Sequence, residues 1–253
     1  MGPEIRFEKL SRCFGAVIAV DSVDLTIGAG SFVALVGESG SGKSTLLRAI
    51  NRLDEGATRK GRVTIGAEDA GDAPVTALRR RIGYVFQSIG LFPHMNVAAN
   101  VAIGRRARGE LLDETEVATL LGQVGLPARF AVRMPRELSG GQAQRVGIAR
   151  ALAIEPEILL LDEPFAALDP VTRDALGKTL RALHEARGLT TILVTHDMAE
   201  AMLLADRVIV MAAGRIVADA TPADMAAGRG GAEAESLVAV PREQTRRIAE
   251  LGE

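Results

Sequence analysis

The sequence has little cysteine and little histidine, and this shortage excludes two classes of site. Its 253 residues include one cysteine, Cys13, and three histidines. A single cysteine cannot form an intramolecular disulfide, and so few thiol and imidazole ligands argue against a structural zinc site. The cysteine content therefore fits a reducing compartment.

Long apolar runs and an excess of one charge are also absent. The most apolar stretches, 158–168 and 201–214, are interrupted by charged residues, whereas a membrane span needs roughly 18 clean apolar residues. The first fifteen residues carry charges where a signal peptide requires an apolar run. Thirty Lys and Arg against 32 Asp and Glu give a formal charge of −2, so no basic field favours nucleic acid or anionic lipid. We expect a chain that does not cross a bilayer and that binds its ligands at local sites.

What the sequence does contain is an alternation of short apolar runs and helical segments. The hydrophobic content of 47% is ample for a core. Runs rich in Val and Ile predict strands at 31–37, 62–66, 81–87, 157–164, 190–196, 207–211 and 214–220. Helices are expected from Lys43 to about Leu53, from Pro170 to Arg187 with Asp169 as N-cap, and from Asp197 to Ala205. Strands that are apolar throughout and followed by helices predict an α/β fold with a largely parallel sheet.

The alternation stops between Ser88 and Glu155, where helical patterns dominate. We therefore expect residues 1–87 and 156–220 to form the core and residues 88–155 to form an inserted helical subdomain. Residues 221–253 are rich in glycine and then charged, which predicts a flexible link to one surface helix.

The stretch GESGSGKST, Gly37 to Thr45, lies between a predicted strand and a predicted helix and matches the P-loop pattern. In a P-loop, glycines turn backbone N–H groups toward phosphates, while Lys43 would reach the β- and γ-oxygens and Ser44 would ligate Mg²⁺. The predicted ATP-binding residues in this stretch are Gly37, Ser39, Gly40, Ser41, Gly42, Lys43, Ser44 and Thr45.

Two acids end the apolar run ILLLDEP. Asp162 is placed to hold Mg²⁺, and Glu163 to orient and deprotonate a water that attacks the γ-phosphate. The alternative is that both acids simply end a strand in solvent. Because the chain also has a P-loop, the catalytic interpretation is favoured.

Two further polar residues end predicted strands. His196, in VTHD, would lie at the strand edge where ligands of such sheets bind and would contact the γ-phosphate. Gln87 would touch Mg²⁺ or the attacking water and couple the nucleotide state to the helical insertion. A structural histidine and a solvated glutamine remain the alternatives.

The segment RELSGGQAQR contains Ser139, Gly140, Gly141 and Gln142 at the start of an expected helix. Glycines and unsatisfied N–H groups at a helix start make an anion site, although an ordinary serine N-cap explains the pattern equally well on its own. Since the P-loop already supplies one phosphate cradle, we expect this second one to serve the ATP of another chain.

Together these residues resemble the ATP-binding subunit of ATP-binding cassette (ABC) transporters over nearly the whole chain. The match includes the Walker A segment at 37–45, the Q-loop Gln87, the LSGGQ signature, the Walker B strand, the D-loop Asp169 and the switch His196. The resemblance implies a P-loop ATPase core with an N-terminal antiparallel β subdomain. It also implies a head-to-tail dimer in which ATP lies between one P-loop and the partner's signature, and an adenine stacked on Phe14.

Within this family, the strings IGLFPHMNV, LRRRIGYVFQ and DEPFAALDP look most like those of bacterial importers of glycine betaine, choline or carnitine. We expect an ATPase on the cytoplasmic face of the membrane, docked to permease subunits through 87–104 and served by a separate solute-binding protein. Leu91, Phe92, Pro93, His94 and Met95 would form the docking groove, unless this loop is simply buried.

Several alternatives stay open at this stage. Importers of amino acids or polyamines are the nearest ones, and a non-transport ABC ATPase or a non-hydrolytic regulator is a further one. A paired regulatory domain, which many osmoprotectant relatives carry after the ATPase, does not follow in these residues, so the sequence does not determine whether this subunit is gated osmotically. The solute, the permease and the choice between a homodimer and a heterodimer are not determined by the sequence.

Overall fold

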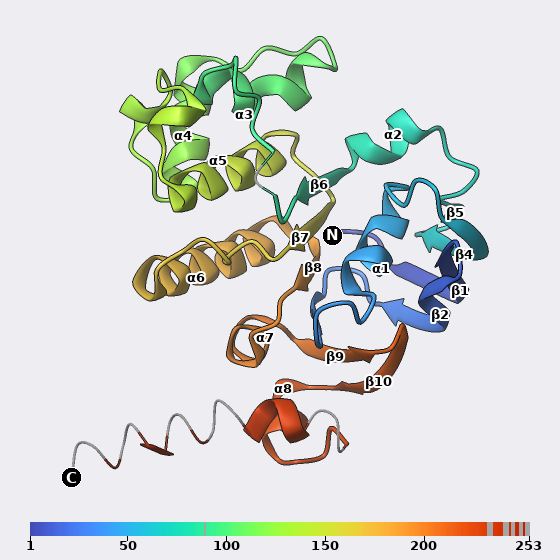
Figure 1. Cartoon of the computed structure of the whole chain (residues 1–253). Helices are drawn as coiled ribbons and strands as arrows, with labels where there is room; N and C mark the ends of the chain where they lie inside the picture. Colours follow the sequence, from blue (N-terminus) through green and yellow to red (C-terminus); the bar gives the residue numbers. More distant parts are fainter. Residues whose placement is uncertain (89, 232–234, 240–242, 244–245, 248–249, 251–253) are drawn as a thin grey trace. The chain divides into compact units, whose positions relative to one another are not determined.

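A computed structural model describes the chain except for residues 89, 232–234, 240–242, 244–245, 248–249 and 251–253 (Figure 1). The chain divides into two compact units. The P-loop unit comprises residues 4–72 and 192–253, and the signature unit comprises residues 1–3 and 73–191. Neither unit is one continuous piece of sequence.

An antiparallel sheet forms one part of the P-loop unit. Its strands are β1 (Ile5–Phe14), β2 (Val17–Ile27), β4 (Thr58–Ile65) and β5 (Glu68–Asp69), in the order β2-β1-β4-β5. Ile5 pairs with Ile27 on one side and with Ile65 on the other. Side chains of β1 alternate between buried and exposed, as expected for a sheet with one face against a core. The N-terminal antiparallel subdomain implied by the family resemblance is confirmed.

The rest of the P-loop unit is built on a strand that is buried throughout. Strand β3 (Phe32–Val36) runs parallel to β9 (Arg207–Ala212), which pairs antiparallel with β10 (Arg215–Ala220). The helices of this unit are α1 (Lys43–Ile50), α7 (Met198–Leu204) and α8 (Pro222–Ala226). The apolar composition of β3 fits a strand with both faces covered.

The signature unit combines a parallel strand pair with most of the helices. Strand β6 (Ile82–Val85) runs parallel to β7 (Ile158–Asp162), and β8 (Thr190–Val194) carries the chain from this unit into the P-loop unit. The helices are α2 (Val75–Arg80), α3 (Val97–Arg106), α4 (Glu114–Gln123), α5 (Gly140–Ala153) and α6 (Pro170–Arg187), with short 3₁₀ turns η1 (Ala128–Phe130) and η2 (Pro135–Glu137). Helix α5 packs against α3, α4 and β6.

The predicted α/β class with a mostly parallel main sheet is confirmed, and so is helix 170–187 with its Asp169 cap. Strand β6, however, ends at Val85, so Gln87 lies beyond the strand and not at its last position. The short helix α8 falls where a flexible link was expected. Most of the helix expected in 241–253 lies outside the described residues.

The predicted division into a core and an insertion at 88–155 stays a prediction. Among the described residues, none of the helices has the length and apolar character needed to cross a membrane.

Candidate functional site

The P-loop is a tight turn closed around its own lysine. The Lys43 Nζ atom donates to the carbonyl oxygens of Gly37 and Glu38, at 2.8 and 2.7 Å, and to the Ser41 hydroxyl at 3.2 Å. Gly42 has φ +102°, and a Cβ atom there would lie 2.3 Å from the Ala19 carbonyl oxygen, so only glycine fits. Lys43, which is 5% exposed, is thus held inside a backbone cradle of the kind that binds phosphates.

The turn between β9 and β10 supports this loop from outside. The N–H of Gly214 donates to the Ser41 carbonyl at 3.0 Å, and the Gly214 carbonyl accepts from the N–H of Asp21 at 2.9 Å. Arg215 forms an ion pair with Asp21 at 2.6 Å. The P-loop is therefore fixed by backbone bonds to a turn that lies more than 170 residues later in the chain.

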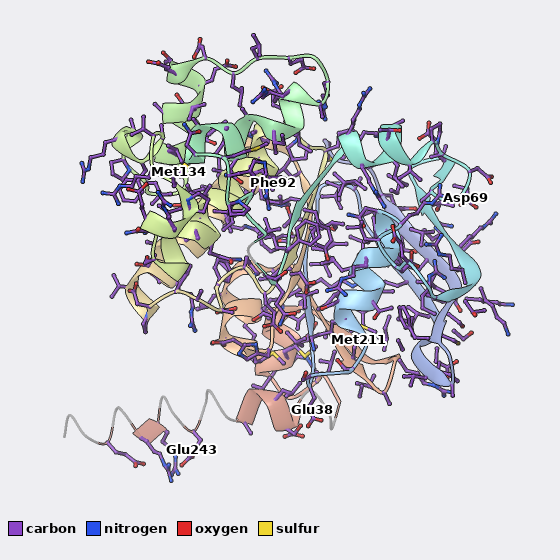
Figure 2. All side chains as sticks on the ribbon, turned by 45° about the horizontal axis from the view of Figure 1, so that its top comes forward. Glu38, Asp69, Phe92, Met134, Met211 and Glu243 are labelled. Carbon is purple, nitrogen blue, oxygen red and sulfur yellow. The ribbon has the colours of Figure 1, made fainter. Side chains whose placement is uncertain are left out.

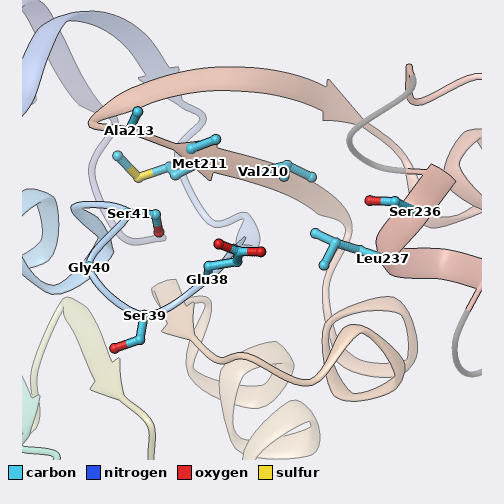
Figure 3. Close-up of a pocket in the computed structure, with 11 residues that line it drawn as sticks. Glu38, Ser39, Gly40, Ser41, Val210, Met211, Ala213, Ser236 and Leu237 are labelled. Atoms are coloured by element: carbon cyan, nitrogen blue, oxygen red, sulfur yellow. The ribbon is translucent and has the colours of Figure 1, made fainter.

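A cavity of about 250 Å³ borders the P-loop, and Figure 3 shows Glu38, Met211 and Leu237 around it. Its lining consists of Gly37 to Ser41, Val210 to Ala213, Ser236 and Leu237. Val238 beside them is 1% exposed. Part of the segment 221–253, for which the sequence predicted a flexible link and a surface helix, therefore packs within the P-loop unit.

Phe14 and His196 both belong to the P-loop unit and are exposed. Phe14 ends β1 with 39% of its surface accessible, so it is not a core side chain and its ring is available for stacking. His196 lies in the turn between β8 and α7. Asp197 in this turn caps α7 through the N–H groups of Ala199 and Glu200, at 2.8 and 3.2 Å.

The acidic pair lies in the signature unit. Asp162, at the end of β7, is fully buried and accepts a hydrogen bond from the Tyr84 hydroxyl at 3.2 Å. Glu163 follows at φ +49° and is half-buried, a strained backbone conformation of the kind found at functional positions. Gln87 Nε2 donates to Glu163 Oε2 at 3.4 Å. The structure thus brings together Gln87 and Glu163, which the sequence predicted to act on the same water.

The predicted Mg²⁺ ligands have the chemistry that this ion requires. A serine hydroxyl, a carboxylate and an amide oxygen are all hard oxygen donors, which suit Mg²⁺ held together with nucleotide phosphates. Ser44 lies in the P-loop unit, and Asp162 and Gln87 lie in the signature unit. The described residues contain no cluster of three or more His, Cys, Asp or Glu that would bind a metal without such phosphates.

The signature begins helix α5 with a reciprocal cap. The Ser139 hydroxyl accepts from the N–H of Gln142 at 3.3 Å, and Gln142 Oε1 accepts from the N–H of Ser139 at 3.1 Å. A Cβ atom on Gly141 would lie 2.9 Å from the Leu168 side chain and 3.2 Å from the Ala167 carbonyl oxygen. At least this glycine therefore serves close packing against the chain's own D-loop, a role that the sequence interpretation did not include.

Asp169 caps α6 by accepting a hydrogen bond from the N–H of Thr172 at 3.0 Å. The backbone and side chain of Thr172 lower the pKa of the Asp169 carboxyl. Because the folded-state pKa is lowered, the cap stabilises the fold at pH values above the unfolded pKa. That stabilisation is lost as the pH falls through the lowered pKa.

The loop after Gln87 is organised by one buried asparagine. Asn100, fully buried in α3, accepts from the N–H of Phe92 at 2.8 Å and donates to the carbonyl oxygens of Phe92, Met95 and Asn96, at 3.1, 2.9 and 3.0 Å. Phe92, labelled in Figure 2, stays 41% exposed, and its ring contacts the His94 ring edge-on. This loop is therefore not simply buried. It is a fixed turn that presents an aromatic side chain.

Replacing Asn100 by alanine would remove the side-chain hydrogen bonds to the N–H of Phe92 and to the Met95 carbonyl. The carbonyl oxygens of Phe92 and Asn96 would keep their backbone donors, the N–H groups of Met95 and residue 100. We expect Asn100→Ala to lower the free energy of unfolding by about 3 kcal/mol. Asn96→Ala is the matched control, because Asn96 makes one capping bond to the N–H of Ala99 at 2.8 Å and should cost about 1 kcal/mol. Urea unfolding measures both values. Equal effects of the two variants would contradict this role of Asn100.

A groove of about 810 Å³ lies over the helices of the signature unit. It is bordered by α3, α4, η1 and the segment between α3 and α4. Leu111 and Val132 on its rim are 82% and 77% exposed. Large apolar side chains so exposed beside a groove are typical of a protein-interaction surface.

Comparison with known proteins decides the family. The sequence model described as "ABC transporter" matches residues 20–166, more than half of the chain. The chain belongs to the ABC transporter family. As an ABC ATPase chain, it is similar to the glycine betaine uptake system ATP-binding protein of Escherichia coli (strain K12), with 46% identity over 87% of this chain and 72% of that protein.

Two other ABC proteins are similarly related. The glycine betaine/carnitine/choline transport ATP-binding protein of Bacillus subtilis is 43% identical over 86% of this chain, which spans 58% of that protein. The sulfate/thiosulfate import ATP-binding protein of Mycobacterium tuberculosis (strain H37Rv) is 48% identical over 85% of this chain and 60% of that protein. This chain thus spans less than two thirds of both.

A solved ABC structure has the same fold. The dimeric structure of a post-hydrolysis state of an ATP-binding cassette bound to ADP and Pi matches with a TM-score of 0.80 and 35% identity. The match covers 86% of this chain and 98% of the chain in that structure. The predicted ATPase class is therefore confirmed by family and by fold.

Proposed function

We propose that this ABC ATPase hydrolyses ATP in a head-to-tail dimer and so powers a membrane importer. One observation carries the proposal: the chain holds both a lysine-centred P-loop and an exposed, serine-capped signature helix. A chain with both can bind ATP through the first and close on the ATP of a second copy through the other. The dimeric ADP-bound relative supports this arrangement.

Each residue has a defined task in this proposal. Lys43 and the P-loop N–H groups bind the phosphates, and Phe14 stacks on the adenine. Glu163 accepts the proton of the attacking water, and Gln87 orients that water. His196 contacts the γ-phosphate, and the D-loop Asp169 keeps the start of α6 ordered beside the signature.

Ser44, Asp162 and Gln87 would hold Mg²⁺. When bound, the ion neutralises charge on the phosphate oxygens. Tyr84 fixes the orientation of the Asp162 carboxylate through its hydroxyl.

The proposed solute is a small quaternary amine such as glycine betaine or choline, taken up with the help of a separate solute-binding protein. Two of the relatives described above carry these solutes in their names, and the predicted loop sequence around Phe92 points the same way. The sulfate/thiosulfate relative makes import of another small solute the second candidate.

We further propose that the permease docks on the cytoplasmic side, against the loop held by Asn100 and the groove beside it. The predicted docking segment, 87–104, supplies the exposed ring of Phe92 and part of α3. The groove adds apolar surface from 111–132, which lies outside the predicted segment. A short permease helix is the occupant that such a groove suits.

The experiment that tests this function is purification of the tagged chain from gently solubilised membranes of its native cell, followed by mass spectrometry. A stoichiometric permease encoded beside a quaternary-amine-binding protein is expected. A neighbouring binding protein for another solute would reassign the substrate. Recovery of soluble partners alone would contradict the transport function.

A further inference from the structure

Arg150 joins the signature helix to the loop that carries Gln87. Arg150 lies on α5, eleven residues after Ser139, which is roughly 16 Å along the helix axis. Its Nη1 atom donates to the Gly90 carbonyl at 2.7 Å. The contact spans 60 positions of sequence, so it ties two distant segments of the signature unit together.

Arg150 is a charged donor on a partly buried side chain. Much of the side chain is removed from water, and this burial lowers the pKa of the guanidinium. A charged donor makes a stronger hydrogen bond to a carbonyl oxygen than a neutral donor does. Helix α5 is itself packed against α3, α4 and β6, so it holds the arginine as part of a rigid body.

The other end of the same loop segment is fixed at the acidic pair. Gln87 donates to Glu163 at 3.4 Å, three residues before the carbonyl that Arg150 holds. Gln87 and Gly90 are three positions apart in the sequence, so we expect a displacement of the Gly90 carbonyl to change the position of Gln87. The position of Gln87 relative to Glu163 therefore depends on the position of α5.

We propose that Arg150 is a positioning residue, which sets Gln87 against Glu163 by holding the Gly90 carbonyl to the signature helix. The proposal rests on the proposed function, in which Gln87 acts at the chain's own ATP and Ser139 acts at the partner's. A displacement of α5 by the partner's ATP then reaches Gln87 through Arg150. This contact links the two ATP sites of the dimer within one chain.

The test is a double-mutant cycle between Arg150→Met and Gln87→Ala in the full chain. Arg150→Met should lower kcat for ATP about tenfold and leave ATP binding by the monomer within about twofold. In the Gln87→Ala background the same change should have an effect of less than twofold, because the residue it positions is gone. Equal losses in both backgrounds would overturn the proposal.

Arg145→Met is the matched control. Arg145 lies on the same helix and donates to another glycine carbonyl, Gly125, at 2.9 Å. Its effect on kcat, whatever its size, should be the same with and without Gln87. If Arg150→Met does not fold, Arg150→Lys replaces it and should give a smaller loss that also disappears in the Gln87→Ala background.

A second measurement does not depend on activity. Hydrogen–deuterium exchange of the amides in 86–92 should become about tenfold faster in Arg150→Met and stay unchanged in Arg145→Met. Unchanged exchange in both variants would overturn the positioning role. Failure of the proposed function would give a different result. The wild-type chain would then not hydrolyse ATP, but Arg150→Met would still exchange the amides in 86–92 faster than the wild type.

Discussion

Glu163→Gln is expected to lower the rate of ATP hydrolysis by a factor of about 100 to 10,000, which is the range that a general base contributes. Glutamine keeps the size and polarity of the side chain and loses only the ability to accept the proton. Because ATP binding needs no proton transfer, the variant should still bind ATP and should accumulate as ATP-bound dimers. Size-exclusion chromatography with ATP and a steady-state assay measure the two effects.

The conformation of Glu163 suggests a control for this variant. The residue has a positive φ angle of 49°, and this conformation costs glutamate and glutamine about the same because both have a Cβ atom. Glu163→Asp retains the carboxylate in a shorter side chain and should keep more activity than glutamine if proton transfer is the task. A glutamine variant with wild-type hydrolysis would remove Glu163 from this role.

Ser139→Arg is the second change with a large expected effect. Ser139 is exposed at the start of α5, and an arginine there places a long charged side chain where the partner's ATP must approach. We expect turnover to fall about a hundredfold, with no ATP-induced dimer, while the monomer binds ATP nearly as well as the wild type. A fluorescent ATP analogue and light scattering separate the two properties.

Ser139→Ala is the matched control for the loss of the cap. It removes the bond to the N–H of Gln142 without adding bulk, so it should lower stability by about 1 kcal/mol and still allow dimers. If Ser139→Arg abolished ATP binding by the monomer, the signature would belong to the chain's own ATP site. The head-to-tail arrangement would then be wrong.

Local patterns were enough to predict the P-loop, the acidic pair and the cap of α6. The Asp169-Pro170 start and the Gly188 end of α6 are both where the sequence places them, because capping is a property of a few adjacent residues. The proximity of Gln87 and Glu163 was also predictable, since both follow strands of one parallel pair.

Contacts between distant segments could not be predicted in the same way. Nothing in AANVAIG marks Asn100 as the residue that holds Phe92, because a buried asparagine looks like any polar residue within a helix. Arg150 and Gly90 are 60 positions apart, and neither has a local pattern that indicates the other. An asparagine or arginine on the apolar face of a predicted helix is nevertheless a signal that could have prompted a search for a buried partner.

The division of the chain also affects how the protein can fold and be manipulated. The P-loop unit needs β9, whose Arg207 pairs with Val33, so its central parallel pair cannot form until the residues through β9 have left the ribosome. Such a high contact order slows folding and leaves the apolar strand β3 exposed in the meantime. For the same reason no simple truncation isolates the P-loop unit, whose two pieces are 4–72 and 192–253. Isolating this unit would require a circularly permuted chain.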